Sequence, residues 1–191
     1  MATVVLFHSV LGLRQVEIEA ANRMRSAGHT VFSPDLYAGL TTNSTEEGSL
    51  LKDSIGWQTI CKRARAALDL VPETAVLAGH SMGAGVVNDM WPERPMCRGV
   101  VLLHALADIP PNAPQGMPIA VHVADPDPFA LPEEVAQWTT TASKAGVCAD
   151  VFTYPGVGHF YTDRTLADYN WTASEQTWER VLLFLSAIPS H

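Results

Sequence analysis

The feature that most constrains the fold is the alternation of short apolar runs with longer segments of helical spacing. The runs are mostly apolar and show no regular alternation with polar residues, as burial of a strand on both faces requires. The predicted strands cover residues 4–7, 30–32, 75–78, 99–103, 118–123 and 150–154. The predicted helices cover residues 14–27, 54–70, a segment ending near 90, 131–144 and 174–185. This order predicts an α/β fold with a mostly parallel sheet of about six to seven strands and helices on both faces.

Composition limits the partners of the chain. It has 191 residues, of which 47% are hydrophobic and 17% charged, so we expect one domain over residues 1–191 with a substantial core. The net charge of −8 argues against a nucleic-acid partner and gives no attraction to an anionic membrane. The start of the chain lacks the basic segment of a signal peptide, and no apolar run is long enough to span a bilayer. We therefore expect a cytoplasmic protein, either a monomer or a small homo-oligomer.

The three cysteines, Cys61, Cys97 and Cys148, are scattered and show no C-x-x-C spacing. Free and mostly buried thiols in a reducing compartment are the expected state. The sequence gives no reason to expect a metal or a cofactor.

A G-x-S-x-G pattern, Gly79-His80-Ser81-Met82-Gly83, lies between the predicted strand 75–78 and a helix. In that position the pattern is typical of a nucleophile elbow, whose strained turn needs small neighbours on each side of the serine. The turn also places the hydroxyl at a helix N-terminus, where free N–H groups stabilise a developing oxyanion. Ser81 is therefore the candidate nucleophile.

A serine nucleophile needs a base and an acid that orients it. His159 follows the last predicted strand in a glycine-rich loop, which is where the order serine, acid, histidine places the base. Asp125 and Asp127 both follow the fifth strand, at the sheet edge where Ser81 should emerge. Asp127 is the preferred acid and Asp125 the alternative, with Asp108 a weaker candidate.

The oxyanion hole needs two donors, which topology places at two loops. One is the backbone N–H of Met82, the residue after the nucleophile. The other comes from the loop after the first strand, with Val10 as the first choice and Ser9 as the second. His8, at the end of that strand, is a candidate for the border of the pocket. The polar segment 39–53, expected to be a loop, and Trp57 are further candidates.

These motifs together resemble the dienelactone hydrolase family of α/β-hydrolases. The resemblance rests on "VVLFHSVLGL", "GHTVFSPDLYAG", "GHSMGAG", "IAVHVADPDPF" and "YPGVGHFYTD", with a similar tail "LADYNWTASEQTWERVLLFL". It covers nearly the whole chain, with the motifs in the family's order. It implies Ser81 as nucleophile, Asp127 as acid and His159 as base.

Two positions depart from the family pattern. Ser81 stands where the founding members have a cysteine, and Ser9 stands where they have a glutamate that helps govern the ionisation of that thiol. A serine needs general-base help during attack, so both changes point to a serine-esterase mechanism and away from dienelactone itself. Family members also bind a substrate carboxylate with arginines. Arg164, near His159, is the candidate here, and a solvated surface arginine is the preferred alternative for it. The short segment 105–116 leaves no room for a lid domain.

The sequence thus predicts a serine hydrolase that cleaves a small carboxylic ester or lactone through an acyl-enzyme. The same triad also suits acyl transfer, perhydrolysis, or cleavage of a thioester or amide. A rival from another class is a non-catalytic protein that uses the pocket to bind a small ligand.

Overall fold

The computed structural model describes residues 1–189 and contains one six-stranded, all-parallel sheet. The strands are β1 Thr3–Phe7, β2 Thr30–Phe32, β3 Val76–His80, β4 Val100–Leu103, β5 Pro118–Asp125 and β6 Cys148–Pro155. Their order across the sheet is β2-β1-β3-β4-β5-β6. The predicted parallel α/β architecture is confirmed, with six strands.

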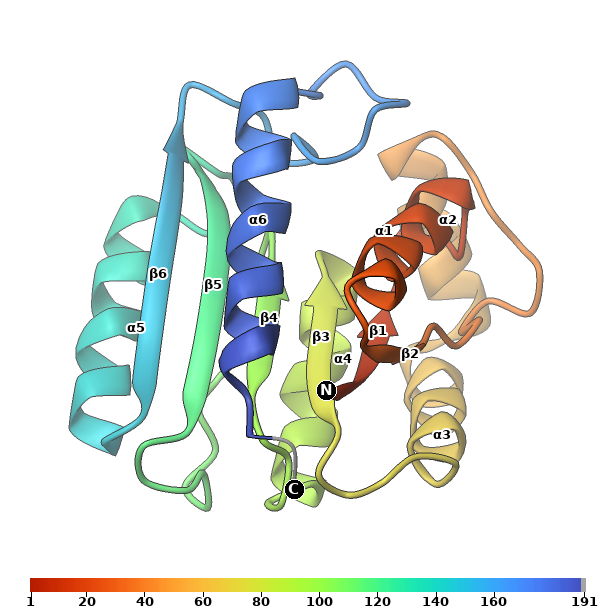
Figure 1. Ribbon diagram of the computed structural model, residues 1–191. Coiled ribbons are helices and arrows are strands. Elements are labelled where there is room, and N and C mark those ends of the chain that lie inside the picture. The colour runs from red at the N-terminus through yellow and green to blue at the C-terminus, as the bar shows by residue number, and fades with distance from the viewer. Residues whose placement is uncertain (190–191) are drawn as a thin grey trace.

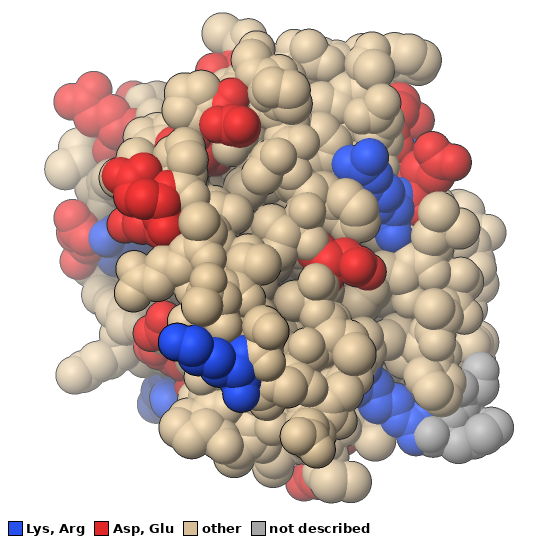
Figure 2. All heavy atoms as spheres, turned by 90° about the vertical axis from the view of Figure 1, so that its left-hand side faces the viewer, with Lys and Arg blue, Asp and Glu red and all other residues tan. Residues whose placement is uncertain are grey.

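Six α-helices flank this sheet (Figure 1). They are α1 Gln15–Ser26, α2 Thr45–Ile55, α3 Trp57–Leu68, α4 Met82–Met90, α5 Pro132–Ala145 and α6 Trp171–Ala187, with a 3-10 turn at Trp91–Glu93. In Figure 1, α1 and α6 lie in front of the sheet and α3, α4 and α5 lie behind it. The face turned to the viewer in Figure 2, at the β6 side, shows charged side chains scattered among uncharged ones.

Each face of the sheet has its own apolar core, because successive strand residues point to opposite faces. Leu77 of β3 belongs to the larger core, which includes residues of α3, α4 and α5. Its neighbours Val76 and Ala78 belong to the second core, with residues of α1 and α6. Burial on both faces explains the apolar runs of β1, β3 and β4, whereas the edge strands β2 and β6 are partly exposed.

The strand order reverses between β1 and β3. From β1 the chain crosses to β2 on one side, and it then returns to place β3 on the other side of β1. In open parallel sheets, ligands bind at such a switch point, outside the carboxyl ends of the strands. The loop after β1 begins at His8, and the turn after β3 contains Ser81. Both therefore meet at one end of the sheet.

The polar segment 38–53 differs from the loop that the sequence predicts, because its second half is helical. Ser44 caps α2 by accepting a hydrogen bond from the N–H of Glu47. The Ser44-x-x-Glu47 spacing is a capping-box signature, so the sequence does carry a signal for this helix. The predicted helix 54–70 is also divided, since Gly56 has a φ of 83° and separates α2 from α3.

Other expectations about the chain are met. The segment between β4 and β5 contains no helix, so no lid is inserted there. All three cysteines are free, with Cys61 and Cys97 buried and Cys148 exposed. Within residues 1–189, no helix is long and apolar enough to cross a membrane.

Candidate active site

Ser81 occupies a strained turn between β3 and α4. Its φ of 54° and ψ of −110° lie where side-chain-bearing residues are rarely found. Two glycines make the turn possible: a Cβ at Gly79 would lie 2.3 Å from the backbone of Gly83, and one at Gly83 would lie 2.2 Å from the carbonyl oxygen of Phe7. The N–H of Ser81 is held by the carbonyl of Leu103 at 2.7 Å. This strained strand-to-helix turn has the backbone geometry typical of a nucleophile elbow.

Three of the residues singled out from the sequence form one hydrogen-bonded chain. The Oγ atom of Ser81 lies 2.8 Å from Nε2 of His159. The opposite ring nitrogen, Nδ1, lies 2.8 Å and 2.9 Å from the two carboxylate oxygens of Asp127. Asp127 is fully buried and His159 nearly so, which shields both contacts from water. With Nδ1–H donating to Asp127, Nε2 is free to accept the proton of the serine hydroxyl.

The two aspartates after β5 have different surroundings. Asp127 contacts His159 and also accepts a hydrogen bond from the N–H of Phe129. Asp125 is half-buried, and its carbonyl oxygen accepts from the N–H of Gly156. The structure thus brings Asp127 to the histidine and leaves Asp125 in the strand pairing. The ring of Phe129 lies over His159, with 4.6 Å between centroids.

A cavity of about 370 Å³ opens beside Ser81 and His159. Its apolar wall includes Val10, Trp57 and Met82, and the N-terminal half of α2 adds a polar rim. The lining residues are Val10, Thr45, Ser49, Lys52, Trp57, Ser81, Met82, Gly85, Ala105, Leu106, Phe129, His159 and Phe160. A space of this size fits a small molecule with one polar reacting group.

The structure brings only some of the predicted pocket residues to this cavity. Trp57 lines it, with its indole N–H donating to Asp89 at 2.7 Å. His8 and Ser9 are fully buried and lie outside the lining, since their side chains bond to neighbouring loops and to Glu17. Arg164 is exposed and pairs with Glu19 on the surface. Arg164 is absent from the cavity lining, which agrees with the alternative of a solvated surface arginine.

Segment 39–53, which the sequence singled out as a border of the pocket, does line the cavity, through Thr45, Ser49 and Lys52 of helix α2 and not through a loop. Gly48 is the point of closest approach between this helix and the loop after β1, because a Cβ there would lie 2.6 Å from the carbonyl oxygen of Val10. Lys52 adds a cation to the pocket rim and contacts Asp53 at 2.9 Å. The capping signature at Ser44 was the sequence signal that this side of the pocket is helical.

The histidines around the triad are buried and neutral in character. Burial lowers the pKa of His80 and of His122 to about 3. Burial also lowers the pKa of His104 well below its ordinary value, and the neighbouring His80 and His159 add to this. His104 contacts Thr162 at 2.8 Å and His122 contacts the hydroxyl of Tyr154 at 3.0 Å. Each is packed in the core and contacts a hydroxyl group through one ring nitrogen.

Metal-ligating side chains do not gather around this site. Over residues 1–189, no group of three or more His, Cys, Asp or Glu side chains is arranged to hold a metal ion.

A parallel sheet with a serine elbow after β3 and a histidine after its last strand defines an α/β-hydrolase. Within that class, the chain belongs to the dienelactone hydrolase family, because the sequence model of that family matches residues 1–188. No curated protein matches the chain in sequence.

Solved structures share this fold. A dienelactone hydrolase-like promiscuous phosphotriesterase from metagenomic libraries superposes with a TM-score of 0.80 at 19% identity, covering 98% of this chain and 87% of that one. A putative dienelactone hydrolase from Klebsiella pneumoniae superposes with a TM-score of 0.71 at 14% identity, again covering 98% of this chain and 87% of that one. The thioesterase domain from the curacin biosynthetic pathway gives 0.63 at 14% identity, covering 95% of this chain and 90% of that one.

Proposed function

We propose that this protein is a serine hydrolase that cleaves small carboxylic esters or lactones through an acyl-enzyme. The observation that carries the proposal is the unbroken contact from Ser81 through His159 to Asp127, placed at the mouth of a cavity. Membership of a family of hydrolases supports the reaction type. The modest size of the cavity supports a small substrate.

In the proposed mechanism, the hydroxyl of Ser81 attacks the carbonyl carbon while Nε2 of His159 accepts its proton. Asp127 keeps the proton on Nδ1 and stabilises the imidazolium. The backbone N–H groups of Met82 and Val10, two residues that line the cavity, bind the oxyanion. His159 then protonates the leaving alkoxide. It next activates a water molecule that hydrolyses the acyl-enzyme and releases the acid.

A fluorophosphonate probe tests whether Ser81 is activated without requiring the natural substrate. Intact-protein mass spectrometry of the wild type should show one adduct, and Ser81→Ala should show none. The same variant should lower kcat for short p-nitrophenyl esters by about three orders of magnitude or more, with circular dichroism unchanged. A well-folded wild type without an adduct would remove the proposal and favour a ligand-binding protein.

Turnover then separates the hydrolase from other users of the same triad. A panel of short esters and lactones is incubated with and without an added alcohol, and the products are identified by mass spectrometry. Free acid as the main product supports hydrolysis. A new ester as the main product would assign the protein to acyl transfer.

A further inference from the structure

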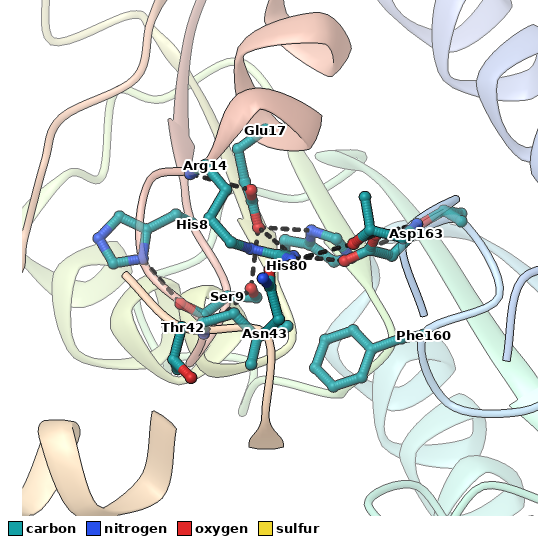
Figure 3. Close-up of polar contacts among 12 residues, drawn as sticks. His8, Ser9, Arg14, Glu17, Thr42, Asn43, His80, Phe160 and Asp163 are labelled. Carbon is teal, nitrogen blue, oxygen red and sulfur yellow. Dashed lines mark hydrogen bonds and ion pairs between the residues drawn. The ribbon is translucent and has the colours of Figure 1, made fainter. Parts of the chain in front are cut away.

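Behind the candidate site lies a buried cluster of charged and polar side chains that the proposed mechanism does not use. We call Ser9, Arg14, Glu17 and Asp163 the buried polar cluster (Figure 3). Ser9 and Asp163 are fully buried, and Glu17 is 1% exposed. Burial raises the pKa of the Glu17 carboxyl, and the nearby Arg14 opposes this. Such groups are costly to bury, so their arrangement calls for a role that offsets the cost.

Glu17 fastens the loop after β1 to helix α1. One carboxylate oxygen accepts from the hydroxyl of Ser9 at 2.9 Å, and the other accepts from the backbone N–H of Arg14 at 3.2 Å. The Ser9 hydroxyl oxygen in turn accepts from the N–H of Leu11 at 3.3 Å. Val10 lies between Ser9 and Leu11, so its peptide is fixed from both sides.

Arg14 joins this loop to the loop that carries His159. Its guanidinium pairs with Asp163, four residues after His159, and donates to Thr165 at 3.2 Å. Asp163 is itself held by the N–H of Thr165 at 2.9 Å. The contact between Arg14 and Asp163 bridges 149 residues of sequence. It therefore sets the position of the His159 loop against the loop after β1.

His80 connects a third segment, the turn after β3, to the buried polar cluster. It directly precedes Ser81, and its ring nitrogens lie 3.9 Å from the carboxylate of Glu17 and 3.4 Å from the hydroxyl of Thr162. Figure 3 shows the side chains of Ser9, Arg14, Glu17, His80 and Asp163 converging on one point. The segments that carry Val10, Ser81 and His159 thus all reach the buried polar cluster.

We infer that Glu17, acting through Ser9, is a positioning residue that holds the N–H of Val10 where the oxyanion forms. This inference rests on the proposed function. A backbone donor has no side chain of its own to fix it, so the peptide must be held by its neighbours. Rate is sensitive to such placement, since a displacement of about 1 Å costs roughly a hundredfold. Glu17 and Ser9 are buried and absent from the cavity lining, so they can hold this peptide without contacting a substrate.

The test compares Ser9→Ala with the wild type and with Glu19→Gln. Ser9→Ala removes the hydroxyl that connects Glu17 to the loop and leaves the charges of the cluster paired. Glu19→Gln, also on α1, breaks the exposed pair with Arg164 and is the matched control. The readouts are kcat and KM for p-nitrophenyl acetate, and the affinity for a trifluoromethyl ketone, which forms an oxyanion on the serine.

We expect Ser9→Ala to lower kcat by about tenfold to a hundredfold with KM within about twofold of the wild type. The affinity for the trifluoromethyl ketone should fall in parallel. Glu19→Gln should leave all three values unchanged. A merely structural role for Ser9 would lower the melting temperature and leave kcat and the inhibitor affinity unchanged, and that result would overturn the inference.

Glu17→Gln provides a second variant. Its amide oxygen still accepts from Ser9, but its NH₂ group cannot accept from the N–H of Arg14. We expect a smaller loss of kcat than in Ser9→Ala, and a larger loss of inhibitor affinity than in Glu19→Gln. Wild-type kcat and inhibitor affinity in both Ser9→Ala and Glu17→Gln would refute the positioning role while the proposed function stands. A wild type that neither binds the ketone nor turns over esters would instead refute the proposed function.

Discussion

Two ion pairs join the same two segments of the chain, but one is buried and the other is exposed. The inner pair joins Arg14 to Asp163, whose side chains are 8% and 0% exposed. Arg164 and Glu19 connect the same loop to the same helix end, with side chains that are 56% and 41% exposed. Water and salt screen the outer pair, whereas the inner pair has given up its hydration.

The difference in exposure shows which of these two ion pairs the stability of the fold depends on. A buried charge whose partner is lost cannot regain water, so each member of the inner pair depends on the other. An exposed charge whose partner is lost is simply hydrated. The sequence shows four similar charged residues, and only their burial separates a structural lock from a surface contact.

The largest effect is expected from Arg14→Met. This change leaves Asp163 buried without its cationic partner, and the free energy of unfolding should fall by about 3–5 kcal/mol. Urea denaturation at pH 7 measures the loss. The double variant Arg14→Met with Asp163→Asn should recover part of it, because Asp163 then carries no unpaired charge, whereas Glu17, 3.6 Å from Arg14 in the wild type, still lacks its cation. A single variant as stable as the wild type would show that water reaches Asp163.

His122 extends the comparison of buried and exposed ionisable groups. It is buried beside the hydroxyl of Tyr154 and, among residues 1–189, has no ion-pair partner. Its pKa falls from 6.5 to about 3 on folding, so the unfolded chain binds more protons between these values. Its contribution to stability is present above pH 6.5 and is lost as the pH falls toward 3. It should add up to about 1.4 kcal/mol per pH unit to the slope of the unfolding free energy in this window.

His122→Phe keeps a ring against Phe152 and removes the titration. Tyr154 still accepts a hydrogen bond from Arg180 in this variant. Urea denaturation of both proteins between pH 7 and pH 5 should give a shallower pH dependence for the variant. Equal slopes would mean that His122 titrates alike in the folded and unfolded chains.

The hydrogen bond between Trp57 and Asp89 is intermediate in exposure between the buried Arg14–Asp163 pair and the exposed Arg164–Glu19 pair. Asp89→Leu removes the acceptor of the indole N–H and should cost about 1 kcal/mol. Since Trp57 lines the cavity, KM for aromatic esters should rise while kcat changes little. Asp89→Asn retains an acceptor oxygen and is the control. A larger effect in Asp89→Asn than in Asp89→Leu would contradict this interpretation.

The smallest effect is expected from Glu19→Gln, which removes the outer pair. The urea midpoint should stay within experimental error of the wild type at 0.15 M salt, an ionic strength at which surface charges are largely screened. Repeating the measurement at low salt is the sensitive check. A loss comparable to that of Arg14→Met would remove the distinction between the two pairs.

Local sequence was sufficient for the parts of the site that depend on steric rules. The glycines around Ser81 predict the elbow because any side chain at Gly79 or Gly83 would collide with backbone. The apolar runs predict the inner strands β1, β3 and β4 because both of their faces are covered. The order of Ser81, Asp127 and His159 along the chain follows from that alternation, since each comes after a strand and therefore reaches the same edge.

Tertiary structure alone decided the contacts between segments. The sequence favoured Asp127 over Asp125 but left both open, and the path of the loop brings Asp127 to His159. Arg14 meets Asp163 because α1 and the loop after β6 lie at the same end of one sheet, an arrangement that no short window of sequence contains. Arg164 is adjacent to Asp163 and yet points to the surface. Burial, which decides what each of these charges does, is a property of the assembled fold.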